Sequence, residues 1–130
     1  MTKYELQQRT QRFHVDVIRL CCSFPKNAAG FETAKQLIRS AGSVGANYRT
    51  ACRAKSKADF IYKIEVVLEE ADESLYWLQV SLEASFAKAD DLKPLIKEAN
   101  ELVSIFNAAD MTAKKSRQAN PKIPKYQNQQ

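Results

Sequence analysis

Residues 61–82 read IYKIEVVLEEADESLYWLQVSL and hold the most regular pattern in the chain. Apolar residues recur there at alternating spacings of three and four, as on the face of a helix that packs against other helices. Just before this run, Ser56-x-x-Asp59 has the form of a helix N-terminal cap. The pattern therefore predicts a long amphipathic helix with a core face of Ile61, Ile64, Leu68, Ala71, Leu75, Leu78 and Leu82.

Three other segments show helical periodicity, and no segment alternates as a β-strand does. We expect helices from about Thr2 to Cys22, from about Phe31 to Ala54 and from Asp90 to about Ser116, with a loop at Lys26–Gly30 after the helix-breaking Pro25. Their predicted core faces are Leu6, Phe13, Val17, Leu20 and Phe24 in the first, Ala34, Leu37, Ala41, Val44, Tyr48 and Ala51 in the second, and Leu92, Leu95, Ala99, Leu102, Phe106 and Ala109 in the last.

Four amphipathic helices with short connections predict an all-α fold, an antiparallel up-down-up-down four-helix bundle. We expect residues 1–115 to form this bundle. Residues 116–130 contain two prolines and no acidic residue, and we interpret them as a flexible basic tail. Within the second helix, Gly42 and Gly45 each cost about 1 kcal/mol of helix stability relative to alanine. Two such glycines indicate that a neighbouring helix approaches closely there.

The composition fits one soluble domain. The chain has 130 residues, 45% of them hydrophobic, with 20 Lys+Arg against 15 Asp+Glu and a net charge of +5. The longest uncharged stretch near the middle, Ser74–Leu82, is far shorter than a membrane-spanning helix, and the N-terminus has no apolar signal core. The three cysteines show no paired spacing, which is typical of reduced thiols. We therefore expect a cytoplasmic protein with no membrane partner.

No catalytic or metal-binding motif is evident. The chain has one histidine, His14, and no phosphate-binding glycine loop followed by lysine. A di-iron centre in a bundle needs Glu-x-x-His on each of two helices, and Glu70-x-x-Glu73 does not supply it. We accordingly expect no catalytic residues, no cofactor, no metal site and no small-molecule substrate.

Charge is segregated along the chain, with basic residues gathered between Lys35 and Lys63. On the predicted second helix, four of them share a face whose centre, at Gly42 and Ala46, is small enough to admit a phosphate backbone. Alternatively, the arginines pair with acidic residues of a neighbouring subunit. The candidate nucleic-acid-binding residues are Lys35, Arg39, Arg49, Arg53, Lys55 and Lys57.

The helix at residues 61–82 has a second apolar face, opposite its core face. Aromatic residues on the outer face of a helix indicate a partner surface. The alternative is that the first helix or the tail covers them. The candidate interface between copies of the chain consists of Tyr62, Val66, Tyr76, Trp77 and Val80, together with Glu69 and Glu73 in the same stripe.

Several blocks of sequence occur in a specific order: FPK at 24–26, RSxxSVGANYRxA at 39–51, RAxSxADF at 53–60 and EEADESxYWL at 69–78. They resemble the bacterial four-helix bundle proteins encoded within intervening sequences of 23S ribosomal RNA genes, over about Phe13 to Phe106. The resemblance implies a ring-like pentamer with a central channel, no enzymatic activity, and an association with RNA or the ribosome inferred from gene location. A related branch, the accessory protein of diversity-generating retroelements, binds a reverse transcriptase and nucleic acid through a basic surface.

Together these observations predict a non-catalytic homo-oligomer that binds RNA or a ribonucleoprotein. The resemblance implies five subunits. The alternative is a protein-binding adaptor or assembly scaffold that does not bind nucleic acid.

Overall fold

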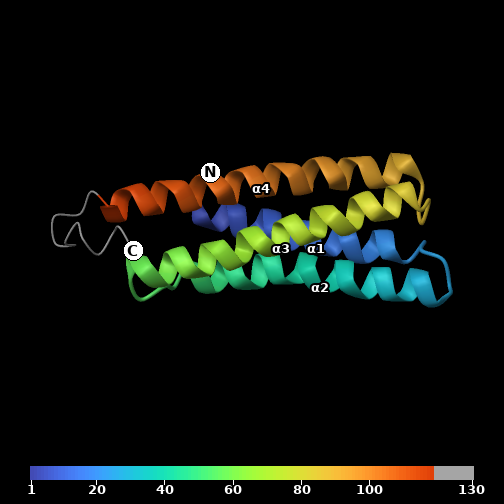
Figure 1. Cartoon of the computed structure of the whole chain (residues 1–130), viewed down its shortest axis with the longest axis horizontal. Helices are drawn as coiled ribbons and strands as arrows, with labels where there is room; N and C mark the ends of the chain where they lie inside the picture. The colour runs from blue at the N-terminus through green and yellow to red at the C-terminus, as the bar shows by residue number, and fades with distance from the viewer. Residues whose placement is uncertain (119–130) are drawn as a thin grey trace.

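The computed structural model describes residues 1–118 as four α-helices, and these residues contain no strand. The helices are α1 (Lys3–Cys21), α2 (Ala28–Ala51), α3 (Lys57–Glu83) and α4 (Ala89–Gln118). Each helix runs antiparallel to the one before it (Figure 1), which confirms the predicted all-α up-down-up-down bundle. The contact of α3 with α2 and α4 is extensive, whereas α1 meets α4 only sparingly.

The structure describes only the first three residues of the predicted tail, residues 116–130. Ser116, Arg117 and Gln118 continue α4, although we had placed them in the tail. The rest of the predicted tail, residues 119–130, lies outside the described residues.

Side-chain caps begin the first three helices. Thr2 accepts a hydrogen bond from the amide of Glu5. Ser56 accepts one from the amide of Asp59, as the sequence indicated. Asn27 caps α2 in the same way, so this helix begins at Ala28 and not after the predicted loop at 26–30. Gly30 in its first turn lies against the backbone of Pro25, where a Cβ would stand 2.0 Å from the carbonyl oxygen.

The other end of α2 also differs from the prediction. We expected the helix to continue to Ala54, but it ends at Ala51. Its last turn tightens, because the amides of Arg53 and Ala54 bond to the carbonyls of Thr50 and Ala51, three residues back. Arg53 therefore lies in the connection to α3 and not on the helix.

The core runs the length of the bundle and contains the predicted apolar faces of α1 and most of those of α2 and α4. In α3 the buried stripe is rotated from the prediction: Val67, Ser74 and Ser81 are fully buried, whereas Leu68, Leu75 and Leu82 are half-buried. The reason is that α3 packs between two helices. The serines need little space, and Ser74 Oγ donates to Ser40 Oγ of α2 at 3.0 Å.

Two predicted core alanines, Ala34 and Ala109, are only half-buried. In α4 the buried position next to Ala109 is taken by Asp110, whose Oδ2 is 2.9 Å from Lys114 Nζ. The ion pair with Lys114 offsets part of the cost of burying this carboxylate.

The small residues of α2 are covered by α1, as predicted. A Cβ on Gly42 would stand 2.8 Å from Cε1 and Nε2 of His14, and Gly45 faces Thr10 in the same manner one turn along. The two glycines thus allow the backbones of α1 and α2 to come close.

Candidate interaction surfaces

All six basic residues of the candidate nucleic-acid set are exposed, but they do not form one helix face. Lys35, Arg39 and Arg49 lie on α2, whereas Arg53 and Lys55 lie in the connection and Lys57 is the first residue of α3. The expected bare centre of this face is also partly filled, because the imidazole of His14 lies over Gly42. The prediction that Arg53 shares the α2 face with Lys35, Arg39 and Arg49 was therefore wrong.

Arg39 is engaged within its own chain. Its Nη1 donates to Glu70 Oε2 at 3.0 Å and its Nη2 donates to Glu73, so two carboxylates of α3 face one guanidinium. The hydrogen bond to Glu73 is the main cause of the raised pKa of Arg39. Glu73 thus pairs with Arg39 of its own chain, and the prediction of a partner from an adjacent subunit was wrong for this pair. Because two carboxylates offset its positive charge, Arg39 attracts a phosphate less strongly than an unpaired arginine would.

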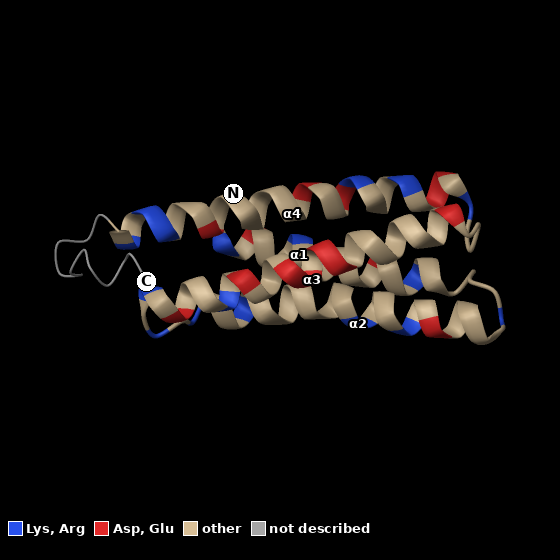
Figure 2. Cartoon of the chain, viewed as in Figure 1, with Lys and Arg blue, Asp and Glu red and all other residues tan. Residues whose placement is uncertain are grey.

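Four of the other candidates gather at one end of the bundle, whereas Lys35 lies two turns into α2, near the opposite end. The end of α2, the connection that follows, the start of α3 and the end of α4 meet there, and Lys57 Nζ hydrogen-bonds Ser116 Oγ. Figure 2 shows the blue residues on these segments. Within residues 1–118, six cations at this end form no ion pair; we call them the basic end, and they are Arg49, Arg53, Lys55, Lys57, Lys115 and Arg117.

Two other lysines at this end are paired. Lys63 bonds Asp59 at 2.9 Å, and Lys114 bonds Asp110 at 2.9 Å and approaches Glu65 of α3 at 3.8 Å. From the sequence we placed Lys115 at the end of the bundle and Arg117 in the basic tail, and neither was among the candidate nucleic-acid-binding residues. Because α4 extends to Gln118, it carries both residues to the α2–α3 connection, and the length of this helix is the feature that could have identified them.

The outer stripe of α3 is less uniform than its sequence indicated. Tyr62 and Tyr76 are 67% and 57% exposed, and Glu69 is exposed. Val66 and Val80 are half-buried.

Trp77 differs from the rest of the stripe. Its ring packs against the core, with the ring of Tyr76 edge-on at 5.1 Å, and its Nε1 is buried without an acceptor among the described residues. The prediction that Trp77 is surplus to the core was therefore wrong. The surface that α3 offers to a partner is centred on the two tyrosines.

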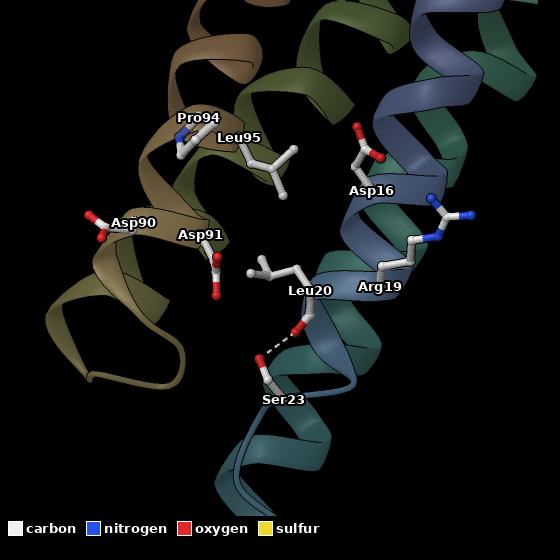
Figure 3. Close-up of a pocket in the computed structure, with 8 residues that line it drawn as sticks. All are labelled: Asp16, Arg19, Leu20, Ser23, Asp90, Asp91, Pro94 and Leu95. Carbon is white, nitrogen blue, oxygen red and sulfur yellow. Dashed lines mark hydrogen bonds between the residues drawn. The ribbon is translucent and has the colours of Figure 1, made fainter.

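A groove of about 450 Å³, lined by both polar and apolar residues, lies at the opposite end of the molecule, between the end of α1 and the start of α4. Figure 3 shows Leu20 and Leu95 pointing toward one another across it, with Asp16 on α1 and Asp91 on α4 to either side. Ser23 Oγ donates to the carbonyl of Leu20 at 2.8 Å, so it is not poised as a nucleophile.

Among residues 1–118, no three His, Cys, Asp or Glu side chains are arranged to hold a metal ion. None of the helices described here is long and apolar enough to cross a membrane.

The comparisons with known proteins agree with this architecture. The family model described as 23S rRNA-intervening sequence protein matches residues 2–108. A crystal structure of a protein of unknown function from the S23 ribosomal protein family of Bacteroides thetaiotaomicron is 28% identical, with a TM-score of 0.74. The match covers 80% of this chain and 96% of that one. No curated protein is significantly similar to the chain. With most of its length matched by the family model, the chain belongs to the 23S rRNA-intervening sequence protein family.

Proposed function

We propose that this protein is a non-catalytic, homo-oligomeric bundle that binds RNA, or an RNA–protein complex, through the basic end. It acts in the cytoplasm and uses no cofactor, metal or small-molecule substrate. The observation that carries the proposal is the set of six cations without an ion-pair partner in residues 1–118, held together by three helix ends and one connection. The family name, which refers to 23S rRNA, supports RNA as the partner.

Physical chemistry favours phosphate as the ligand of such a surface. Exposed lysines and arginines that neutralise phosphates release condensed counterions, and this release drives binding. On a single strand the slope of log affinity against log salt is about −0.7 per phosphate neutralised, so five contacts give roughly −3.5. The fold places these residues at three helix ends and in one short connection, which reduces the ordering cost of binding.

The test is a salt series with a fluorescently labelled RNA hairpin. We expect binding to weaken linearly in log salt, and we expect Arg49→Glu with Arg53→Glu to abolish it while helicity is kept. The matched control is Lys93→Glu with Lys97→Glu, which makes the same charge change on exposed residues near the start of α4. Equal loss in both variants indicates net charge alone, and retained binding in the first variant contradicts this site.

A second candidate function is that of a protein-binding adaptor. The exposed tyrosines of α3 favour it, because tyrosine is enriched at protein interfaces. Binding through such a surface has little salt dependence. A partner retained from lysate after nuclease treatment and at high salt would support the adaptor.

We also propose that the oligomer forms through the outer stripe of α3, with Tyr62 and Tyr76 at its centre. Five subunits is our preferred number, from the family resemblance. Glu69 is exposed in this stripe, and no residue among 1–118 is paired with it, so it is free to meet a cation of another copy.

A further inference from the structure

One end of the bundle is built from fewer helices than the rest. Arg9 of α1 bonds Glu98 and Glu101 of α4, and α1 begins six residues before Arg9. Because the two helices are antiparallel, the start of α1 is about level with residues 104–107 of α4. Beyond that level α4 continues to Gln118, about 16 Å further at 1.5 Å per residue. Figure 1 shows the end of α4 and the start of α3 extending past the N-terminal end of α1.

An apolar groove, which we call the α3/α4 groove, lies between the start of α3 and the end of α4. It has a volume of about 640 Å³, and Lys57 and Ser116 bound it at its outer end, where they are hydrogen-bonded to each other. Phe60 of α3 lines it and packs against the core, yet stays half-buried because α1 does not reach this level. The wall formed by α4 consists of Ile105, Ala108, Ala109, Thr112 and Ala113.

The walls of the α3/α4 groove leave space for a flat ring. Ala108, Ala109 and Thr112 have short side chains, so little side-chain volume fills the space opposite Phe60. Ala108 and Thr112 are exposed, and Phe60 is half-buried, so the groove is open to solvent. Aromatic side chains stack on the bases of unpaired RNA. The groove therefore has the size and the chemistry to accept a nucleobase.

The charges at this groove favour an anionic ligand. Lys57 lines it, and among residues 1–118 no acidic residue does. Four more cations of the basic end lie on the neighbouring segments: Arg53 and Lys55 before α3, and Lys115 and Arg117 at the end of α4. A nucleotide joins a flat, uncharged ring to a phosphate, so it matches an apolar groove that has lysines and arginines around it.

Two other grooves on the molecule lack this combination. The groove between α1 and α4 is lined by three aspartates, Asp16, Asp90 and Asp91, against one arginine, so it repels phosphate. A groove along α4 is lined by Lys93 and Lys97, but no aromatic side chain is among its described lining residues. Of these three grooves, the α3/α4 groove alone brings an aromatic ring and unpaired cations together.

We propose that the α3/α4 groove binds one unpaired base of an RNA, with the base against Phe60 and its phosphates on Lys57 and the neighbouring cations. This inference rests on the proposed binding of RNA at the basic end. A base inside a duplex is stacked between its neighbours, so only a loop, a bulge or a single strand can insert one. The protein therefore prefers RNA with an unpaired base. Stacking of one base changes affinity by a factor of about ten, so the preference is measurable.

The test compares a fully paired RNA duplex with the same duplex carrying one bulged base. Both RNAs are fluorescently labelled, and anisotropy measures their affinities for the full chain at the same salt concentration. We expect the bulged RNA to bind about tenfold more tightly, because its base enters the groove. Equal affinity of the two RNAs would overturn this proposal and leave RNA binding at the basic end intact. If neither RNA binds, the proposed function fails as well.

Two pairs of leucine substitutions on α4 make the test specific to the groove. Ala108→Leu with Thr112→Leu fills it without a change of charge. We expect the tenfold preference to disappear in this variant, while the affinity for the plain duplex stays the same. The matched control, Asn107→Leu with Met111→Leu, places leucines on exposed residues that do not line the groove, and it should keep the preference. A preference that survives in the first variant would overturn the proposal, and a lower mass of that variant in light scattering would then assign the groove to a second copy.

Photo-crosslinking locates the base directly. Thiouridine replaces the bulged base, and in a control RNA it replaces a paired uridine of the stem. We expect the bulged base to crosslink to Phe60 or to residues 105–116, which mass spectrometry of the peptides identifies, and the paired base to give no such product. Crosslinks from the bulged base to another part of the surface would overturn the proposal.

Discussion

Gly45 of α2 lies directly against Thr10 of α1, and a Cβ on Gly45 would stand 3.2 Å from Thr10 Oγ1 and 3.4 Å from Thr10 Cβ. Thr10 is fully buried, and its hydroxyl lies 3.0 Å from the carbonyl oxygens of both Leu6 and Gln7. The side chain is therefore held by its own helix and has no room to move aside. Together with the contact of Gly42 with His14, this contact lets α1 and α2 lie close together.

Replacing Gly45 with leucine should destabilise the protein by about 1–3 kcal/mol, because the new side chain overpacks the contact with Thr10. Thermal or urea unfolding measures the change. Ala46→Leu is the control, since Ala46 is the exposed neighbour, and it should unfold like the unmodified chain. An unchanged midpoint for Gly45→Leu would contradict the close approach of α1.

The helices and this close contact were predictable because they depend on local pattern. Alternating spacings reveal a helix and its apolar face, and glycines inside a helix indicate a near neighbour. The rotation of α3 was not predictable in the same way. Leu68, Leu75 and Leu82 fit the three-and-four spacing just as well as Ser74 and Ser81, which are the residues actually buried. The choice between them is made by the packing of α3 between two other helices.

The candidate site was predictable only in part, because it too depends on how the helices pack and not on local pattern alone. The basic residues were identified, but their partners depend on how helices face each other. Arg39 meets Glu70 and Glu73 because of the relative rotation of α2 and α3, and this rotation cannot be read from the number and position of charges in the sequence. Likewise, the end of α2 at Ala51 depends on hydrogen bonds in its last turn and moves Arg53 into the connection.

Arg9 and Glu98 should be coupled by about 1–2 kcal/mol in a double-mutant cycle of Arg9→Gln and Glu98→Gln. The guanidinium donates from Nε and Nη2 to both carboxylate oxygens at 2.7 Å, and both side chains are about three-quarters buried. The pair joins α1 to α4, where the helices otherwise touch little. The pair Lys63–Asp59 lies within one helix and is the comparison; it should show weaker coupling, because Lys63 makes one hydrogen bond to its carboxylate where Arg9 makes two. Equal couplings would show that the Arg9 contact has no special role.

Cys21 should resist thiol reagents in the folded protein, whereas Cys22 should react readily. Burial raises the pKa of the Cys21 thiol to about 12, so its reactive thiolate is scarce at pH 8, while Cys22 is exposed. The same shift lowers stability at high pH: the unfolded thiol ionises above about pH 8.5, and the folded one stays protonated until about 12. Mass spectrometry of labelled peptides checks this, and equal labelling of the two cysteines would contradict it.

Removing the exposed tyrosines of α3 should dissociate the oligomer. Burying one such side chain contributes roughly 1.5–3 kcal/mol, and a symmetric assembly gains this at every interface. Light scattering at micromolar concentration should report a multiple of 14.7 kDa for the unmodified chain, with five copies preferred. Tyr62→Glu with Tyr76→Glu should shift the mass downward.

The controls for this last experiment separate the interface from the fold. Tyr4 and Phe31 are 69% and 59% exposed on other helices, so Tyr4→Glu with Phe31→Glu should leave the mass unchanged. Trp77→Glu is unsuitable, because the indole packs against the core and its loss would damage the bundle itself. For the same reason a buried Trp77 fluorescence is expected whether or not copies associate, so the mass alone decides. A monomeric mass for the unmodified chain would end the oligomer hypothesis and leave Tyr62 and Tyr76 as a surface for another protein.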